Sequence, residues 1–203
     1  MIVISNPITV DNEINIIHSL FEEGLMLFHV RKPHFGISQM KQFLLNINSN
    51  YRDRLVLHSH YDIAEEFGIN RIHFSESKRK VTLMLPNNLP FAQHTKKGFR
   101  LSTSVHSIED FNELDDSFEY AFLAPVYPSI SKENYFSKVN LLETIKNRNN
   151  YSTSLVALGG IESKNIKKTL KKGFDKVAIL GTIWNRNNPI ENFKSCQKII
   201  QSF

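Results

Sequence analysis

Residues 154–182, SLVALGGIESKNIKKTLKKGFDKVAILGT, carry the pattern that decides the fold. Two apolar segments in it, Ser154–Leu158 and Lys176–Leu180, are too short for buried helices and are typical of buried strands. Between them, Ile166 and Leu170 lie four residues apart in a lysine-rich segment, which predicts a helix with an apolar stripe and a solvated basic face. Apolar strands that alternate with helices indicate a parallel sheet covered by those helices.

The same alternation runs along the whole chain. Further strands are expected at Ile2–Ser5, Leu25–Val30, Leu55–His58, Arg71–Phe74, Arg100–Ser104 and Tyr120–Ala124. Helices are expected at Asp11–Glu23, Ser38–Asn46, Tyr61–Phe67, Ser107–Leu114, Val139–Asn147, Ser163–Lys172 and Pro189–Gln201. Residue types that suit helix N-caps stand at Asp11, Ser38, Ser107 and Ser163.

Eight strand-and-helix units predict an α/β fold, a compact (β/α)8 TIM barrel. The chain has 203 residues, which makes the barrel a minimal one, because this fold usually takes about 250 residues and has a lower bound near 200. An open doubly wound sheet is the alternative. The weak unit is the fourth, since Pro86 and Pro90 follow its strand and no full amphipathic helix is evident. Without a linker, residues 1–203 are expected to form a single domain.

Composition limits the function classes. The chain is 41% hydrophobic and 22% charged, with a net charge of +5, as in ordinary globular proteins. Much of the excess positive charge lies on the lysine-rich helix, and no zinc-finger, helix-turn-helix or aromatic-interleaved basic pattern is present, so no nucleic-acid partner is expected. With one cysteine, no signal-peptide pattern and no apolar run near 20 residues, we expect a cytoplasmic protein without membrane contact.

Polar residues follow the expected strands, where a barrel places its chemistry. Gly159-Gly160 and Gly181-Thr182 come after the seventh and eighth strands, the two loops that often bind phosphate in this fold; two ordinary turns are the alternative. The segment 124–132, APVYPSISK, offers hydroxyls and an ammonium to a diphosphate or carboxylate, unless it is a plain surface loop. His106 is a candidate acid or base, and Arg31 is either an anion ligand or part of a rim salt bridge.

Four histidines, His29, His58, His60 and His73, raise the question of a metal site. We expect none, because His58 and His60 flank a strand end without the helical i, i+4 spacing of common zinc sites and no carboxylate partner is evident. His29 is expected to point into the barrel mouth, to contact a ligand or to pack.

Five segments together resemble the thiamine phosphate synthase and TenI family, in the right order over nearly the whole chain. They are Phe28–Pro33, Ile72–Glu76, Ser102–Ser107, Ala124–Lys132 and Val156–Ile161. The resemblance implies a compact (β/α)8 barrel. In the synthase reaction, a pyrimidine diphosphate loses its diphosphate, a thiazole phosphate captures the cation, and Mg²⁺ holds the leaving group.

By match to the family, each candidate ligand residue has an implied role. Arg31 faces the pyrimidine or its diphosphate, and Ser104 hydrogen-bonds the diphosphate. The side chains that hold the diphosphate and the thiazole are those of Ser129, Ser131 and Lys132. The thiazole phosphate is held by the backbone of Gly160, Gly181 and Thr182.

The departures from the synthase pattern concern the metal. His58-Ser59 replaces an Asn-Asp pair, Ser77-Lys78 replaces an aspartate, and Glu76 is the only carboxylate nearby. Since Mg²⁺ needs oxygen ligands, it has too few here. Pro33 also replaces a lysine that holds the diphosphate, although Lys32 is adjacent.

Loss of the metal ligands and the lysine, with the phosphate loops retained, suggests a ligand that carries a phosphate but no diphosphate. Such a ligand fits the TenI type of this family, a thiazole tautomerase that needs no metal and aromatises a thiazole carboxylate phosphate. Ser104-Val105-His106 matches its Ser-Val-His context and makes His106 the proton shuttle. We therefore expect a thiazole phosphate ligand and no metal or other cofactor, and leave open a homo-oligomer. The alternatives are a divergent synthase, in which Glu76 and water hold Mg²⁺, and a non-catalytic phosphate-ligand binder in the same pathway.

Overall fold

Eight parallel strands close into a ring in the computed structural model, which describes residues 1–84, 89–130, 136–137 and 139–203. Each strand pairs with the next one in the chain, and the last pairs with the first. The strands are β1 (Ile2–Ile4), β2 (Leu27–Val30), β3 (Leu55–Leu57), β4 (Arg71–Phe74), β5 (Arg100–Val105), β6 (Phe118–Leu123), β7 (Ser154–Ala157) and β8 (Lys176–Ile179). The predicted (β/α)8 barrel is confirmed, and the open sheet is wrong.

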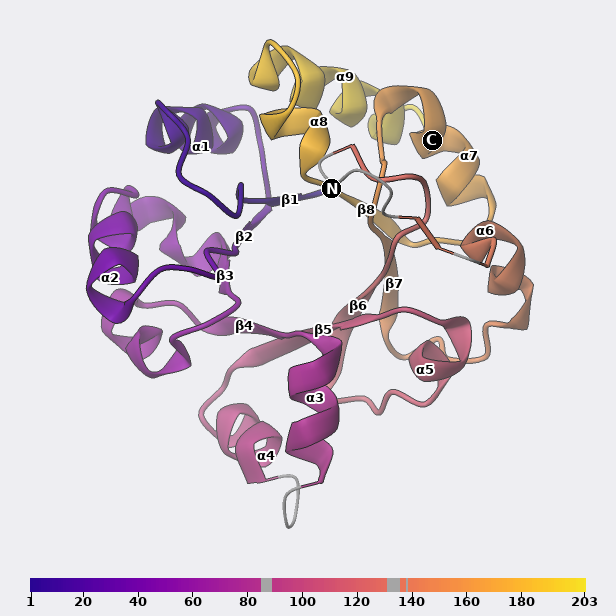
Figure 1. Cartoon of the computed structure of the whole chain (residues 1–203), viewed down its shortest axis with the longest axis horizontal. Coiled ribbons are helices and arrows are strands. Elements are labelled where there is room, and N and C mark those ends of the chain that lie inside the picture. Colours follow the sequence, from indigo (N-terminus) through magenta and orange to yellow (C-terminus); the bar gives the residue numbers. More distant parts are fainter. Residues whose placement is uncertain (85–88, 131–135, 138) are drawn as a thin grey trace.

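Helices form a ring around the strands, as the view along the barrel in Figure 1 shows. The α-helices are α1 (Glu13–Glu22), α2 (Ile37–Leu45), α3 (Glu76–Leu83), α4 (Leu89–Lys96), α5 (Ile108–Asn112), α6 (Leu141–Thr144), α7 (Ser163–Lys171), α8 (Gly181–Trp184) and α9 (Pro189–Gln201). Short 3-10 helices are η1 (Ser49–Arg54), η2 (Tyr61–Ile63), η3 (Glu65–Phe67) and η5 (Ile145–Asn147). None of the described helices is both long and apolar enough to cross a membrane.

The fourth unit corrects the sequence prediction, because it contains two helices, α3 and α4, where none was convincing. Ser75 caps α3, and its side chain accepts a hydrogen bond from the Lys78 amide. Pro90 is the second residue of α4, a first-turn position where the missing N–H costs no helical hydrogen bond. Pro86 lies outside the described residues.

The helices that were predicted begin within two residues of their predicted starts, whereas α8 was not predicted. The Ser107 cap is confirmed, since its hydroxyl accepts from the Asp110 amide at 3.0 Å. The other caps are Asn12, Gly36 and Glu162, in place of Asp11, Ser38 and Ser163. The expected Tyr61–Phe67 helix is instead the pair of 3-10 turns η2 and η3, which Gly68 ends at φ 67°.

The main core lies between the strands and the helices. In α7, Ile166 is buried and Leu170 packs against this core, while the lysines face outward. The predicted solvated face is therefore confirmed. A second, smaller cluster of apolar side chains lies apart from the main core and consists of Ile2, Ile4, Tyr120, Phe122, Val156 and Ala178.

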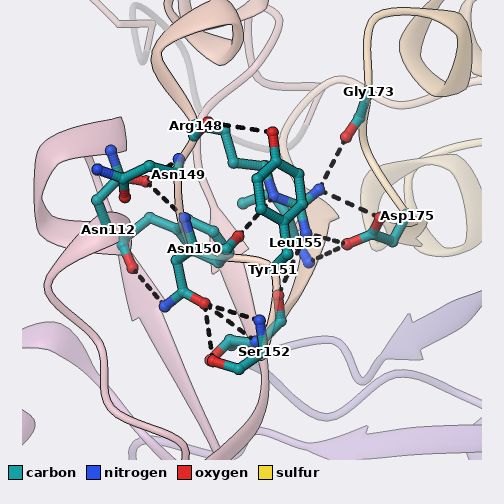
Figure 2. A network of polar contacts seen from close by, with 11 residues as sticks. Asn112, Arg148, Asn149, Asn150, Tyr151, Ser152, Leu155, Gly173 and Asp175 are labelled. Carbon is teal, nitrogen blue, oxygen red and sulfur yellow. Dashed lines mark hydrogen bonds and ion pairs between the residues drawn. The ribbon is translucent and has the colours of Figure 1, made fainter.

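The rim at the amino ends of the strands carries a dense polar network, which Figure 2 shows at close range. Arg148 binds Asp175 through two hydrogen bonds of 3.1 and 2.8 Å, and Asp175 accepts the Leu155 amide at the start of β7. Asn150 donates to carbonyls of the α5 region at 3.3 and 2.9 Å and accepts from the Ser152 amide. These bonds fix the approach to β7 and leave the opposite rim free for ligand chemistry.

Candidate active site

The carboxyl ends of the strands open onto a cavity of about 410 Å³. Sequence-predicted site residues that line it are Arg31, Ser104, His106, Ser129, Gly160, Gly181 and Thr182. Ser131 and Lys132 lie outside the described residues. Apolar side chains such as Phe122, Leu158 and Leu180 complete the wall. A cavity of this size with an apolar wall and a few converging polar groups suits a small ligand.

The loop after β7 needs its two glycines. Gly159 and Gly160 have φ angles of 98° and 62°, a region that favours glycine. A side chain at Gly160 would also place its Cβ 2.7 Å from the Cβ of Tyr127. The loop after β8 begins α8 at Gly181 and Thr182, whose amides cannot donate to carbonyls within that helix. Backbone N–H groups of both loops therefore remain suited to an anion.

The loop after β6 is hydrogen-bonded to the glycine loop. The Val126 amide donates to the Leu158 carbonyl at 2.9 Å, and the Tyr127 amide donates to the Gly159 carbonyl at 3.1 Å. The Tyr127 hydroxyl lies 2.9 Å from the Thr169 hydroxyl of α7. Ser129 thus reaches the cavity from a wall that is fixed on the β7 side.

His106 follows β5 and lines the cavity, with about half of its side chain exposed. Its Nδ1 lies 2.6 Å from the Ala124 carbonyl oxygen. Since a carbonyl only accepts, Nδ1 carries the proton in this contact. Nε2 lies 3.4 Å from a carboxylate oxygen of Glu76, the first residue of α3. The ring is therefore oriented through one nitrogen, and the other is available for proton transfer.

Arg31 and Lys32 are adjacent in sequence and differ in their surroundings. Arg31 lines the cavity, and no described residue forms a hydrogen bond or ion pair with its guanidinium. Lys32 is fully buried away from the cavity, where its ammonium contacts both Glu13 carboxylate oxygens at 2.6 and 2.7 Å. It also donates to the Ile8 carbonyl at 2.9 Å. Lys32 therefore does not replace the lysine that is lost at Pro33.

Three histidines meet inside the barrel. His29, expected at the mouth, is fully buried, and its Nδ1 lies 2.9 Å from Nε2 of His58. Its Nε2 lies 2.6 Å from the Tyr120 hydroxyl. His73 lies 2.9 Å from the Ser104 hydroxyl, and both His58 and His73 line the cavity. His60 is separate, with Nε2 2.8 Å from the Phe35 carbonyl oxygen.

The described residues do not fit Mg²⁺, the ion that the family resemblance implies for the synthase reaction. Among those that line the cavity, Glu76 has the one carboxylate, and Lys80 pairs with it at 2.7 Å. The positions after β3 and within β4 present nitrogen donors from His58 and His73. Mg²⁺ strongly prefers oxygen ligands in octahedral geometry.

Fold and cavity define a (β/α)8-barrel protein with a cavity at the carboxyl ends of its strands. Residues 1–183 match the family described as Thiamine monophosphate synthase. The chain belongs to this family, as its motifs predicted.

Relatives extend this result over the whole chain. The thiamine-phosphate synthase of Caldicellulosiruptor saccharolyticus is 22% identical over 200 residues, which cover 95% of this chain and 86% of that protein. A solved structure of thiamine phosphate pyrophosphorylase from Bacteroides thetaiotaomicron is 28% identical and has a TM-score of 0.75, and the match covers 99% of this chain and 97% of that chain. The structure of thiamine phosphate pyrophosphorylase from Pyrococcus furiosus is 17% identical and has a TM-score of 0.77, and the match covers 99% of this chain and 95% of that chain. This likeness shows the fold.

Proposed function

We propose that this member of a thiamine biosynthesis family is a thiazole tautomerase, which moves one proton on a thiazole carboxylate phosphate and thereby aromatises the ring. The observation that carries the proposal is His106, which the Ala124 carbonyl holds through Nδ1 while Nε2 lies 3.4 Å from the Glu76 carboxylate. The described wall of its cavity lacks a carboxylate set for Mg²⁺. An aromatising proton transfer demands less of a site than expulsion of a diphosphate.

Five of the described site residues have a role in this reaction. The backbone amides at Gly160, Gly181 and Thr182 bind the phosphate, since glycine turns and a helix start present N–H groups to an anion. Arg31 binds the carboxylate, for which a guanidinium has matching geometry. His106 accepts a proton at Nε2 from one atom of the ring and returns it to another, so the enzyme ends as it began.

A divergent thiamine phosphate synthase is the second candidate, and the names of the relatives favour it. In that case Glu76 and water molecules would have to hold Mg²⁺ beside the diphosphate. A non-catalytic binder of the phosphate ligand is the third.

A paired assay distinguishes the three candidates. The purified protein is tested for thiazole tautomer conversion, and separately with pyrimidine diphosphate and thiazole phosphate, each with and without Mg²⁺. We expect tautomer conversion that is unchanged by Mg²⁺, and no thiamine phosphate. Thiamine phosphate formed only with Mg²⁺ would make the protein a synthase, and inactivity in both assays would leave the binder.

Arg31→Met tests the carboxylate role. We expect KM for the thiazole substrate to rise roughly 10–100-fold with a smaller change in kcat, because hydrogen bonds to charged groups contribute about 1.5–3 kcal/mol. Steady-state kinetics measure both constants. Arg52→Met, in η1 and away from the cavity, is the matched control. An unchanged KM in Arg31→Met would remove this residue from the binding site.

A further inference from the structure

The inside of the barrel holds a cluster that the proposed reaction does not use, formed by the imidazoles of His29, His58 and His73. His29 is in β2, His58 directly follows β3 and His73 is in β4, so three adjacent strands supply them. Ring centroids lie 5.1 Å apart for His29 and His58, 5.3 Å for His29 and His73, and 4.2 Å for His58 and His73. Rigid strands therefore hold three nitrogen donors together.

The donor distances are close to those of a metal site. One ring nitrogen from each histidine lies within 4.8 Å of the others, and the His29–His58 pair is 2.9 Å apart. In a tetrahedral zinc site with Zn–N bonds of about 2.0–2.1 Å, ligand nitrogens are about 3.3 Å apart. The close pair must open slightly, and His58 must turn from its stacked position on His73. His58 is only partly buried, which leaves it room to turn.

Ring nitrogens of His29 and His73 have hydroxyl partners of the kind that support metal ligands. Nε2 of His29 lies 2.6 Å from the Tyr120 hydroxyl, and the two nitrogens of His73 lie 2.9 Å from the hydroxyls of Ser102 and Ser104. Because a hydroxyl can either donate or accept a hydrogen bond, it can stabilise the imidazole tautomer whose other ring nitrogen is unprotonated and able to bind a metal ion. Such outer contacts orient the ring and increase the basicity of the ligand.

The charge state also suits a cation. Burial lowers the pKa of all three imidazoles, that of His73 to about 3. Neighbouring histidines lower the pKa of His29 and His58 further, and Arg31 does so for His58 and His73. The rings are therefore neutral near pH 7, and neutral imidazole is the form that binds metals. Three imidazoles without a carboxylate match zinc and its transition-metal neighbours better than Mg²⁺.

We propose that His29, His58 and His73 form a binding site for one divalent transition-metal ion, with the fourth coordination position open to the cavity. His58 and His73 line that cavity, as does Arg31. The fourth ligand is accordingly a water molecule or an anionic oxygen, whose charge would also offset the repulsion between the ion and Arg31. The inference goes beyond the proposed tautomerase, because His106 transfers its proton without these three side chains.

Metal titration of the full chain tests the site. The protein is freed of metal with a chelator, then titrated with Zn²⁺ by calorimetry and with Co²⁺ by visible absorption. We expect one equivalent to bind with a Kd of about 1 μM or tighter, with the intense visible band of four-coordinate cobalt. Thermal unfolding should shift upward with Zn²⁺, since a ligand that binds the folded state stabilises it. Absence of saturable binding near one equivalent would overturn the proposal.

Matched variants locate the ion. His58→Ala should weaken Zn²⁺ binding at least 100-fold, while His34→Ala, which removes an exposed histidine outside the cluster, should leave it unchanged. Equal binding by His58→Ala and the parent protein would contradict the assignment. If His58→Ala does not fold, imidazole NMR of the parent protein replaces it. Zn²⁺ must then shift the ring signals of His29, His58 and His73, and shifts confined to exposed histidines would contradict the site.

Neither readout depends on catalysis. Failure of the tautomer assay would therefore leave the metal site standing, and absence of metal binding would leave the tautomerase standing.

Discussion

His106→Asn is expected to lower kcat for thiazole tautomer conversion by about 10²–10⁴-fold, the usual contribution of one positioned acid–base group. The asparagine amide can still donate to the Ala124 carbonyl, which His106 Nδ1 contacts at 2.6 Å. It cannot accept and return a proton at the position of Nε2. Because the proposed phosphate and carboxylate contacts involve other residues of the cavity, KM should change much less than kcat.

The measurement is steady-state kinetics of the parent protein and the variant, with circular dichroism to show that both are folded. His34→Asn makes the same chemical change at an exposed histidine and should keep full activity. A rate for His106→Asn within about twofold of the parent would exclude His106 as the proton shuttle.

Lys32→Met is expected to lower the free energy of unfolding by about 3–5 kcal/mol, because it leaves a buried carboxylate unpaired. Lys32 and Glu13 have side-chain exposures of 0% and 3%. Burial lowers the pKa of Lys32 and raises that of Glu13 despite their attraction, so each charge depends on the other. Replacement of both, as Lys32→Met with Glu13→Leu, should recover most of the loss.

Urea unfolding of the single and double variants measures these differences. The control is Lys41→Met, which breaks a salt bridge of similar length, 2.6 Å, between half-exposed side chains and should cost less than about 1 kcal/mol. A Lys32→Met loss no larger than that of the control would show that the buried pair contributes little.

The barrel could be predicted because its signal is local. Most strands are short runs rich in apolar residues, and Arg71–Phe74 and Pro189–Gln201 were predicted with the bounds that the structure has. Elsewhere the strand bounds differ by one or two residues, because apolar residues such as Leu158 and Leu180 continue past the strand end, while β5 and β6 extend beyond the predicted segments. The helices after β4 were missed because Pro86 and Pro90 counted against them. Pro90 is tolerated because it lies in the first turn of α4, and the sequence pattern did not show where that helix begins.

The sequence predicted the site residues that lie in loops directly after strands. It did not predict contacts between residues that are distant in sequence. Gly160, Gly181 and Thr182 reach one cavity because the carboxyl ends of all strands meet there. The burial of Lys32 depends on Glu13, in a helix that the strand pattern does not place. A signal for the histidine cluster was present, however, because His29 and His73 each stand third in a four-residue apolar strand. Polar residues at matching positions of buried strands face the same interior.

Closure of the ring by β8 has a consequence for biosynthesis. Ile2 pairs with Ala178, and the Trp184 indole donates to the Ile4 carbonyl at 2.7 Å. At about 5–20 residues per second, roughly 9–35 s therefore pass between the synthesis of β1 and that of its last neighbour. During that interval the nascent sheet exposes an unpaired edge, to which other chains can add. The need of the nascent chain for chaperones should therefore increase with the delay before β8 leaves the ribosome.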